Sequence, residues 1–218
     1  MFQIKICGLT QPGDAEAVAA AGADAIGLNF YPASKRFVEP ATAEAIVRKL
    51  PQSIVRVGLF VNRPASEIRE LVQRLRLDLV QLHGDESPAD IAALDAIPVM
   101  KAFRPKSNSD LISFLESCQQ LSCTPRMVLL DAHIPGAFGG TGHRGNWEIA
   151  QQYRQSLRVP PLVLAGGLTP ENVAEAIRTV QPVAVDTASG VESAPGQKDP
   201  KRIAKFVAAA RAAFGRQS

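Results

Sequence analysis

The sequence predicts an α/β fold, a single-domain (βα)8 barrel that spans residues 1–218. Short apolar runs alternate with segments of helical spacing from end to end, and this alternation is typical of a parallel sheet. The alternation repeats eight times in a length that suits one TIM barrel. Most strand segments have one aliphatic face and one face with isolated polar groups, which favours a closed barrel over an open sheet.

The expected strands are short and rich in aliphatic residues. They begin near Gln3, Asp24, Ile54, Asp78, Pro98, Arg126, Leu162 and Val183. The expected helices that follow them have apolar residues at helical spacing. They cover residues 15–21, 42–50, 66–75, 88–94, 111–118, 147–153, 170–179 and 200–214. No linker or low-complexity stretch interrupts the series, so we expect one domain.

Alternation along the strands predicts which side chains share a face. Lys5 and Cys7 lie on one face of the first strand, and Gln81 and His83 lie on one face of the fourth. Asp131 ends the sixth strand on the face opposite its aliphatic one. We expect these polar faces to line the barrel interior, with the last residues at its mouth.

The third and eighth strands follow the same rule with different polar residues. In the third, Val55, Val57 and Leu59 oppose Arg56, and in the eighth Asp186 opposes the valines. We therefore expect the aliphatic face of the third strand to lie under the helices.

Composition narrows the class of function. The chain is 46% hydrophobic and 21% charged with a net charge of +3, which excludes wholesale disorder and a dedicated nucleic-acid binder. The slight basic excess is compatible with an anionic small-molecule substrate.

The cysteines and the termini favour a cytoplasmic protein. Cys7, Cys118 and Cys123 are odd in number and lack the spacing of metal ligands, which indicates free thiols in a reducing compartment. No signal peptide is evident, and no apolar run approaches the roughly 20 residues of a membrane span. With three widely spaced histidines, including His133 and His143, we expect no metal site.

Two glycine-containing loops predict a phosphate site. Gly166 and Gly167 follow the seventh strand, and Ser189 and Gly190 follow the eighth. The loops after strands seven and eight commonly bind phosphate in barrels, since backbone N–H groups can reach an anion there. Tight βα turns are the alternative explanation for the glycines.

Other candidate site residues lie at the expected carboxyl ends of strands. Asp131 could exchange a proton with a substrate, or cap a helix or join an ion pair. The glycine-rich loop at residues 135–142 could close over substrate or be a passive connector. Arg36 could bind a carboxylate or phosphate, or be a solvated surface cation. His83 and Cys7 could be site residues, or a hydrogen-bonded structural histidine and a packed thiol.

Eight stretches along the whole chain resemble one family, phosphoribosylanthranilate isomerase of tryptophan biosynthesis. They are residues 5–10, 27–32, 57–62, 81–84, 130–131, 139–142, 164–168 and 189–192. Most are short, but their order and number make the resemblance specific. It covers the chain from its first strand to the loop after its eighth.

The resemblance implies a cofactor-free isomerase that interconverts an aldose and a ketose. It implies an Amadori rearrangement of N-(5-phosphoribosyl)anthranilate to 1-(2-carboxyphenylamino)-1-deoxyribulose 5-phosphate. Cys7 would be the general base, Asp131 the general acid, and Arg36 the residue that binds the anthranilate carboxylate. The residues that it implies for phosphate binding are Gly166, Gly167, Ser189 and Gly190.

Two features bear on this implied chemistry. A free thiol titrates at about 8.5, so Cys7 needs help to ionise, and Lys5 on the same face is the nearest candidate. The alternative for Lys5 is an interior salt bridge to Asp186. The chain also departs from the family pattern at Ala188, where a hydroxyl residue is common, and at residues 143–147.

Other readings remain for comparison. Indole-glycerol-phosphate synthase would need an N-terminal extension and a further lysine and glutamate, and a metal-using epimerase would need more histidines and acids. A catalytically dead barrel that binds a phosphorylated ligand would not need both Cys7 and Asp131. We expect no nucleic-acid or membrane partner, and a monomer before a homodimer.

Overall fold

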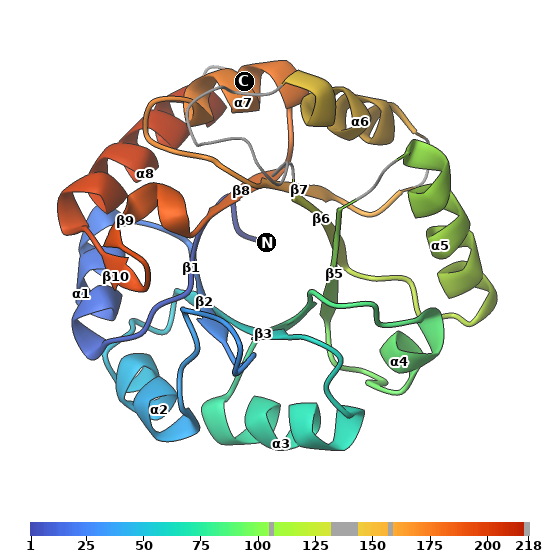
Figure 1. The fold of residues 1–218 in the computed structure, drawn as a ribbon, viewed down its shortest axis with the longest axis horizontal. Coiled ribbons are helices and arrows are strands. Elements are labelled where there is room, and N and C mark those ends of the chain that lie inside the picture. Colours follow the sequence, from blue (N-terminus) through green and yellow to red (C-terminus); the bar gives the residue numbers. More distant parts are fainter. Residues whose placement is uncertain (105–106, 132–143, 157–158, 216–218) are drawn as a thin grey trace.

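Eight parallel strands close into a barrel in sequence order, with β1 hydrogen-bonded to β8. The computed structural model describes residues 1–104, 107–131, 144–156 and 159–215, with side chains from 147 in the third range. Figure 1 shows the helices as an outer ring around the strands. The predicted (βα)8 barrel is confirmed. Across the described residues, no helix is long and apolar enough to cross a membrane.

The strands are four to six residues long. They are β1 Ile4–Cys7, β2 Ala25–Asn29, β3 Val55–Phe60, β4 Leu79–Leu82, β5 Val99–Phe103, β6 Met127–Asp131, β7 Leu162–Ala165 and β8 Ala184–Thr187. The helices alternate with them. They are α1 Pro12–Ala21, α2 Pro40–Arg48, α3 Ala65–Leu75, α4 Pro88–Ala92, α5 Asn108–Gln120, α6 Arg144–Gln155, α7 Val173–Val180 and α8 Pro200–Phe214.

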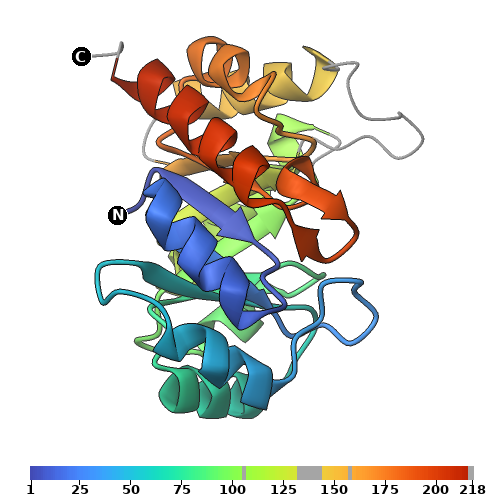
Figure 2. The ribbon, with the colours of Figure 1, turned by 90° about the vertical axis from the view of Figure 1, so that its left-hand side faces the viewer.

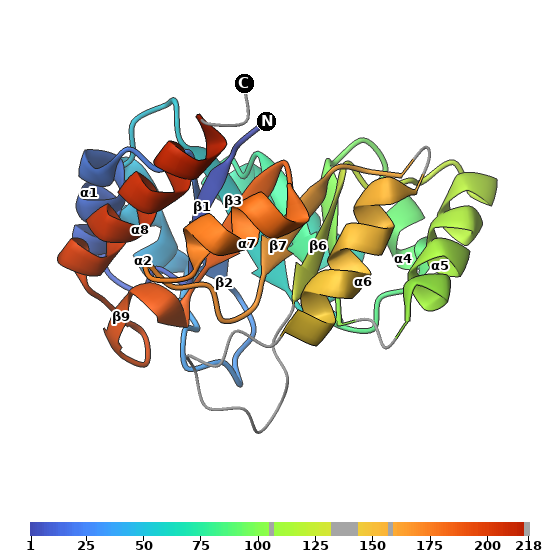
Figure 3. The same cartoon turned by 90° about the horizontal axis from the view of Figure 1, so that it is seen from above.

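A short segment that the strand and helix pattern does not predict follows β8. A single 3-10 turn, η1 Ser189–Val191, leads into an antiparallel hairpin of β9 Glu192–Ala194 and β10 Gln197–Lys198. In Figures 2 and 3 this hairpin lies at the carboxyl end of the barrel, and the N-terminus lies at the opposite end. The hairpin therefore belongs to the end where parallel barrels carry their sites.

Helix boundaries follow local chemistry. Proline occupies the first turn of α1, α2, α4 and α8, where its missing N–H costs no hydrogen bond. Asp199 caps α8 by accepting hydrogen bonds from the backbone N–H groups of Lys201 and Arg202. Capping fixes where the chain leaves the hairpin and enters the last helix.

Both faces of the barrel sheet are buried. A large core packs between the barrel and the helices, and a smaller one of Phe2 with alanine, valine, leucine and methionine residues fills the barrel. Alternation is confirmed for β1, β4 and β6, where Ile6, Val80 and Val128 face the helices and Leu129 faces the interior.

The expectation for β3 is wrong. Val57 packs in the interior, while Phe60 packs under the helices and stacks on Phe30 with ring centroids 5.3 Å apart. A side chain at Gly58 would meet Leu77 at 2.5 Å, so glycine suits the crowded outer face. Arg56 shares the outer face with Phe60, so the polar residue of this strand does not mark the interior as it does in the other strands.

Candidate active site

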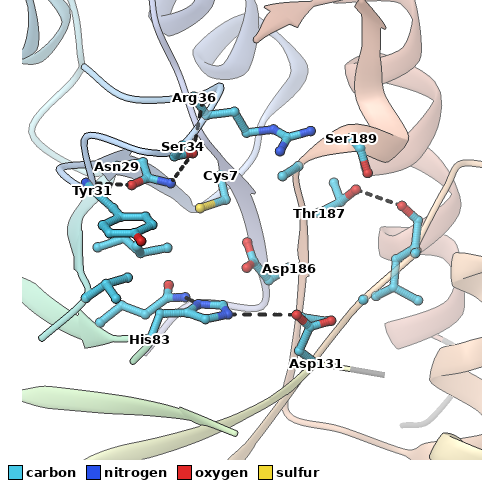
Figure 4. A pocket seen from close by; sticks show the side chains of 18 of the residues that line it. Cys7, Asn29, Tyr31, Ser34, Arg36, His83, Asp131, Asp186, Thr187 and Ser189 are labelled. Atoms are coloured by element: carbon cyan, nitrogen blue, oxygen red, sulfur yellow. Dashed lines mark hydrogen bonds and ion pairs between the residues drawn. The ribbon is translucent and has the colours of Figure 1, made fainter. Parts of the chain in front are cut away.

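A cavity of about 600 Å³ opens at the carboxyl ends of the strands. Figure 4 shows the side chains that line it. It collects most of the residues singled out in the sequence, from six different βα units. They are Cys7, Arg36, His83, Asp131, Gly166, Gly167 and Ser189.

Cys7 ends β1 beside a buried ion pair. The Lys5 ammonium is fully buried and donates to Asp186 Oδ1 at 3.0 Å and to Gln81 Oε1 at 2.9 Å. A Cβ at Gly27 on β2 would lie 2.5 Å from Cys7 Sγ and 3.1 Å from Lys5 Nζ. The neighbouring strand therefore needs glycine here to make room for both groups. The salt bridge considered for Lys5 is present.

Burial and the cationic groups around Cys7 shift the pKa of its thiol in opposite directions. Burial raises the pKa of the thiol, and the negative charge of Asp186 adds to the rise, while Lys5 and Lys198 lower it. The net result is a raised pKa. Burial would lower the pKa of Lys5, but attraction to Asp186 and Cys7 raises it. Lys5 therefore acts in the expected direction, but burial outweighs it and the pKa of the thiol stays above its ordinary value.

Asp131 ends β6 and accepts a hydrogen bond at 3.0 Å from Arg104 Nε, and His83 Nε2 lies 3.8 Å away. Arg104 directly follows β5, which pairs with β6. It was missed because no arginine adjoins Asp131 in sequence. Alternation through Met100 and Ala102, which face the interior, would have identified it.

The hydrogen bonds assign the orientation of Gln81 and His83. An ammonium only donates, so the Gln81 oxygen faces Lys5 and its amide NH2 faces His83 Nδ1 at 2.8 Å. His83 Nδ1 then accepts, and His83 Nε2 lies 3.8 Å from Asp131 Oδ2 and 3.5 Å from Arg104 Nη2. The polar interior thus runs from Asp186 to Asp131 through three side chains.

The loops after β7 and β8 are locked together. Gly166 and Gly167 have φ values of 88° and 67°, and a side chain at Gly167 would meet open space. Thr187 Oγ1 donates to the carbonyl of Leu168 at 2.7 Å. A Cβ at Gly190 would collide with that same carbonyl, so this glycine permits the close approach of the two loops.

Arg36 reaches the cavity from the segment after β2. Its Nε and Nη2 donate to the two carboxylate oxygens of Glu192, each at 2.7 Å. A Cβ at Gly8, whose φ is 76°, would lie 2.6 Å from Arg36 Cδ. Neither Glu192 nor its second partner Lys198 was singled out in the sequence, because hairpin pairing and not chain proximity brings them to Arg36.

A family model described as N-(5'-phosphoribosyl)anthranilate (PRA) isomerase matches residues 4–209 of the chain. The chain belongs to this family. A PRA isomerase from Geobacter sulfurreducens is 47% identical over 97% of this chain and 99% of its own length. One from Neisseria meningitidis serogroup C is 42% identical over 96% of each chain.

Solved structures of PRA isomerases agree with the fold. The Thermotoga maritima crystal structure has a TM-score of 0.85 and 39% identity, and covers 97% of this chain and 100% of its own. A PRA isomerase complex with reduced 1-(o-carboxyphenylamino)-1-deoxyribulose 5-phosphate has a TM-score of 0.81 and 38% identity, over 97% and 100%. A third describes monomers made from the dimeric Thermotoga maritima protein. Like its relatives, the chain is an isomerase of tryptophan biosynthesis.

The departures from the usual PRA isomerase pattern fall in two places. Ala188 lines the cavity, and its carbonyl accepts a hydrogen bond from Lys198 Nζ at 3.0 Å. Trp147 is buried in α6. The glycine-rich loop at 135–142, His133 and His143 lie outside the described residues.

Proposed function

We propose that the chain rearranges N-(5-phosphoribosyl)anthranilate to 1-(2-carboxyphenylamino)-1-deoxyribulose 5-phosphate without a cofactor, with Asp131 as general acid and Cys7 as general base. One observation carries this assignment. The barrel order β6-β7-β8-β1 leaves the two glycine loops between the strand that ends in Asp131 and the strand that ends in Cys7. A phosphate held by those loops would lie between an acid and a base.

Ring opening is the first step. Asp131, when protonated, gives its proton to the ribose ring oxygen, and the bond from that oxygen to C1′ breaks. The lone pair of the anthranilate nitrogen forms the Schiff base that replaces it. The hydrogen bond from Arg104 and the nearby His83 hold the Asp131 carboxyl at the mouth of the barrel.

Proton removal from C2′ is the second step. Cys7 as thiolate takes this proton, and the electrons form an enolamine, which becomes the ketone when C1′ gains a proton and the C2′ hydroxyl loses one. Lys5 and Lys198 favour the thiolate, although burial opposes it. Cys7 therefore works as a base only in the fraction of molecules that have lost the thiol proton.

The remaining residues would hold the substrate. Arg36 is proposed to bind the anthranilate carboxylate, because a guanidinium forks onto a carboxylate with two hydrogen bonds. His83 is proposed to contact substrate beside Asp131. The proposed phosphate ligands are backbone groups at Gly166, Gly167, Ser189 and Gly190.

The proposal also includes the domain organisation, the oligomeric state and the cellular compartment of the protein. We expect residues 1–218 to form one domain that works as a monomer or a homodimer on a phosphorylated small molecule. All three cysteines are free, which supports the reducing environment of the cytoplasm.

The decisive experiment follows the loss of substrate anthranilate fluorescence during turnover. Cys7→Ala and Asp131→Asn should each lower kcat by about a hundredfold or more, because each removes a proton-transfer group. Both should still bind the reduced product analogue. Cys123→Ala and Asp95→Asn, which change the same residue types near the amino end of the barrel, should retain turnover. Near wild-type kcat in both site variants would refute the assigned roles.

A further inference from the structure

Glu192 is a buried anion between two cations at the edge of the cavity. Its side chain is 4% exposed. Arg36 binds both of its oxygens at 2.7 Å, and Lys198 Nζ lies 2.8 Å from Oε1. The Lys198 side chain is fully buried, whereas Arg36 is 26% exposed. The cluster therefore turns one of its three charged groups toward the cavity.

The pairing with Glu192 uses one edge of the Arg36 guanidinium and leaves a second edge for another ligand. A guanidinium has five N–H donors, and Glu192 takes the one on Nε and one on Nη2. One donor of Nη1 and the second donor of Nη2 form the end edge, which can bind another carboxylate with two parallel hydrogen bonds. Figure 4 shows Arg36 reaching from the segment after β2 toward the loop that carries Ser189.

The β9–β10 hairpin holds Glu192 rigidly. Glu192 and Lys198 are partners across its two strands. Thr10 Oγ1 donates to the carbonyl of Gly196 at 2.6 Å, which ties the hairpin to the loop after β1. A Cβ at Gly196 would lie 2.8 Å from the carbonyl oxygen of Lys35, so the hairpin also packs against the residue next to Arg36.

We propose that Glu192 is a positioning residue, which grips the side edge of Arg36 so that its end edge faces the carboxylate of the substrate's anthranilate ring. This role rests on the proposed binding of that carboxylate by Arg36. Lys198 binds Oε1 of Glu192 at 2.8 Å and so keeps the carboxylate in place.

The charge of Glu192 indicates that it acts by orienting Arg36 and not by increasing the attraction between Arg36 and the substrate carboxylate. Burial would raise the pKa of Glu192, but hydrogen bonds from Arg36 and Lys198 lower it, so the residue is an anion. An anion beside Arg36 weakens the pull of the guanidinium on a second carboxylate. Glu192 can help substrate binding only by fixing the direction of the Arg36 donors. If attraction alone matters, removing the charge of Glu192 should strengthen binding of the substrate carboxylate. If orientation of Arg36 matters, removing it should weaken that binding.

The test compares two ligands on three proteins by calorimetry. One ligand is reduced 1-(o-carboxyphenylamino)-1-deoxyribulose 5-phosphate, and the other is the same compound without the carboxyl group. Wild type should bind the first ligand at least about tenfold more tightly, because a bidentate pair between a guanidinium and a carboxylate contributes about that much affinity. In Glu192→Gln this preference should fall to no more than about threefold, and KM should rise more than kcat falls. Glu44→Gln, which breaks a surface pair with Arg74 on α3, should keep the wild-type preference.

Each outcome decides a different point. No preference in wild type would refute carboxylate binding by Arg36. A wild-type preference that Glu192→Gln retains or increases would refute the positioning role and leave Arg36 as the ligand. If Glu192→Gln fails to fold by circular dichroism, Arg36→Lys serves instead, because it keeps the charge and loses the fork. An unchanged preference in Arg36→Lys would likewise refute alignment.

Discussion

The two sides of the site, the base side around the proposed base Cys7 and the acid side around the proposed acid Asp131, are built differently. Cys7 lies next to Lys5 and Asp186, a buried ion pair inside the barrel. Asp131 pairs with Arg104, whose side chain is 67% exposed. The base side is thus a closed set of charges, and the acid side faces the cavity mouth and water. We therefore expect the Lys5–Asp186 pair to matter for the stability of the fold and the Arg104–Asp131 pair to matter little.

The largest effect is expected from breaking the closed pair. Lys5→Met leaves Asp186 buried without its cation, and removing one partner of a buried pair costs about 3–5 kcal/mol. Urea unfolding should record this loss. Lys49→Met, which breaks an exposed pair with Glu16 on α1, should change stability by less than about 1 kcal/mol. Equal losses in both variants would show that burial does not separate the two pairs.

The second effect concerns pH. The proposed base must be deprotonated to act, and the pKa of Cys7 is raised above its ordinary value. The rate constant kcat/KM should therefore increase as pH rises from neutral into the alkaline range, about tenfold per pH unit below that pKa. Because Lys5 lowers the pKa of the thiol, Lys5→Met should move the rise to higher pH if the variant folds. A profile that is flat across this range would contradict Cys7 as the base.

The difference between the two sides also explains what sequence could predict. Alternation along single strands found Cys7 and Asp131, because the period of a strand is a local property. It failed for β3, where Val57 faces inward, because the charged residue of that strand, Arg56, lies on the outer face. The barrel itself was predictable from eight repeats of strand and helix.

The missed residues share a non-local origin. Arg104 meets Asp131 only because β5 and β6 pair. Glu192 and Lys198 meet Arg36 only because a two-stranded hairpin follows β8. No spacing along the chain encodes such contacts, since they depend on the register of neighbouring strands.

The smallest effect is expected on the acid side. Arg104→Met removes an exposed partner, so the free energy of unfolding should change by less than about 1 kcal/mol, in contrast to Lys5→Met. Turnover should fall far less than in Asp131→Asn, because Arg104 holds the carboxyl and transfers no proton. Urea unfolding and kcat, measured on both variants, make this comparison. A loss of stability in Arg104→Met as large as in Lys5→Met would show that the two ion pairs are equivalent, and the contrast between a closed base side and an open acid side would then be wrong.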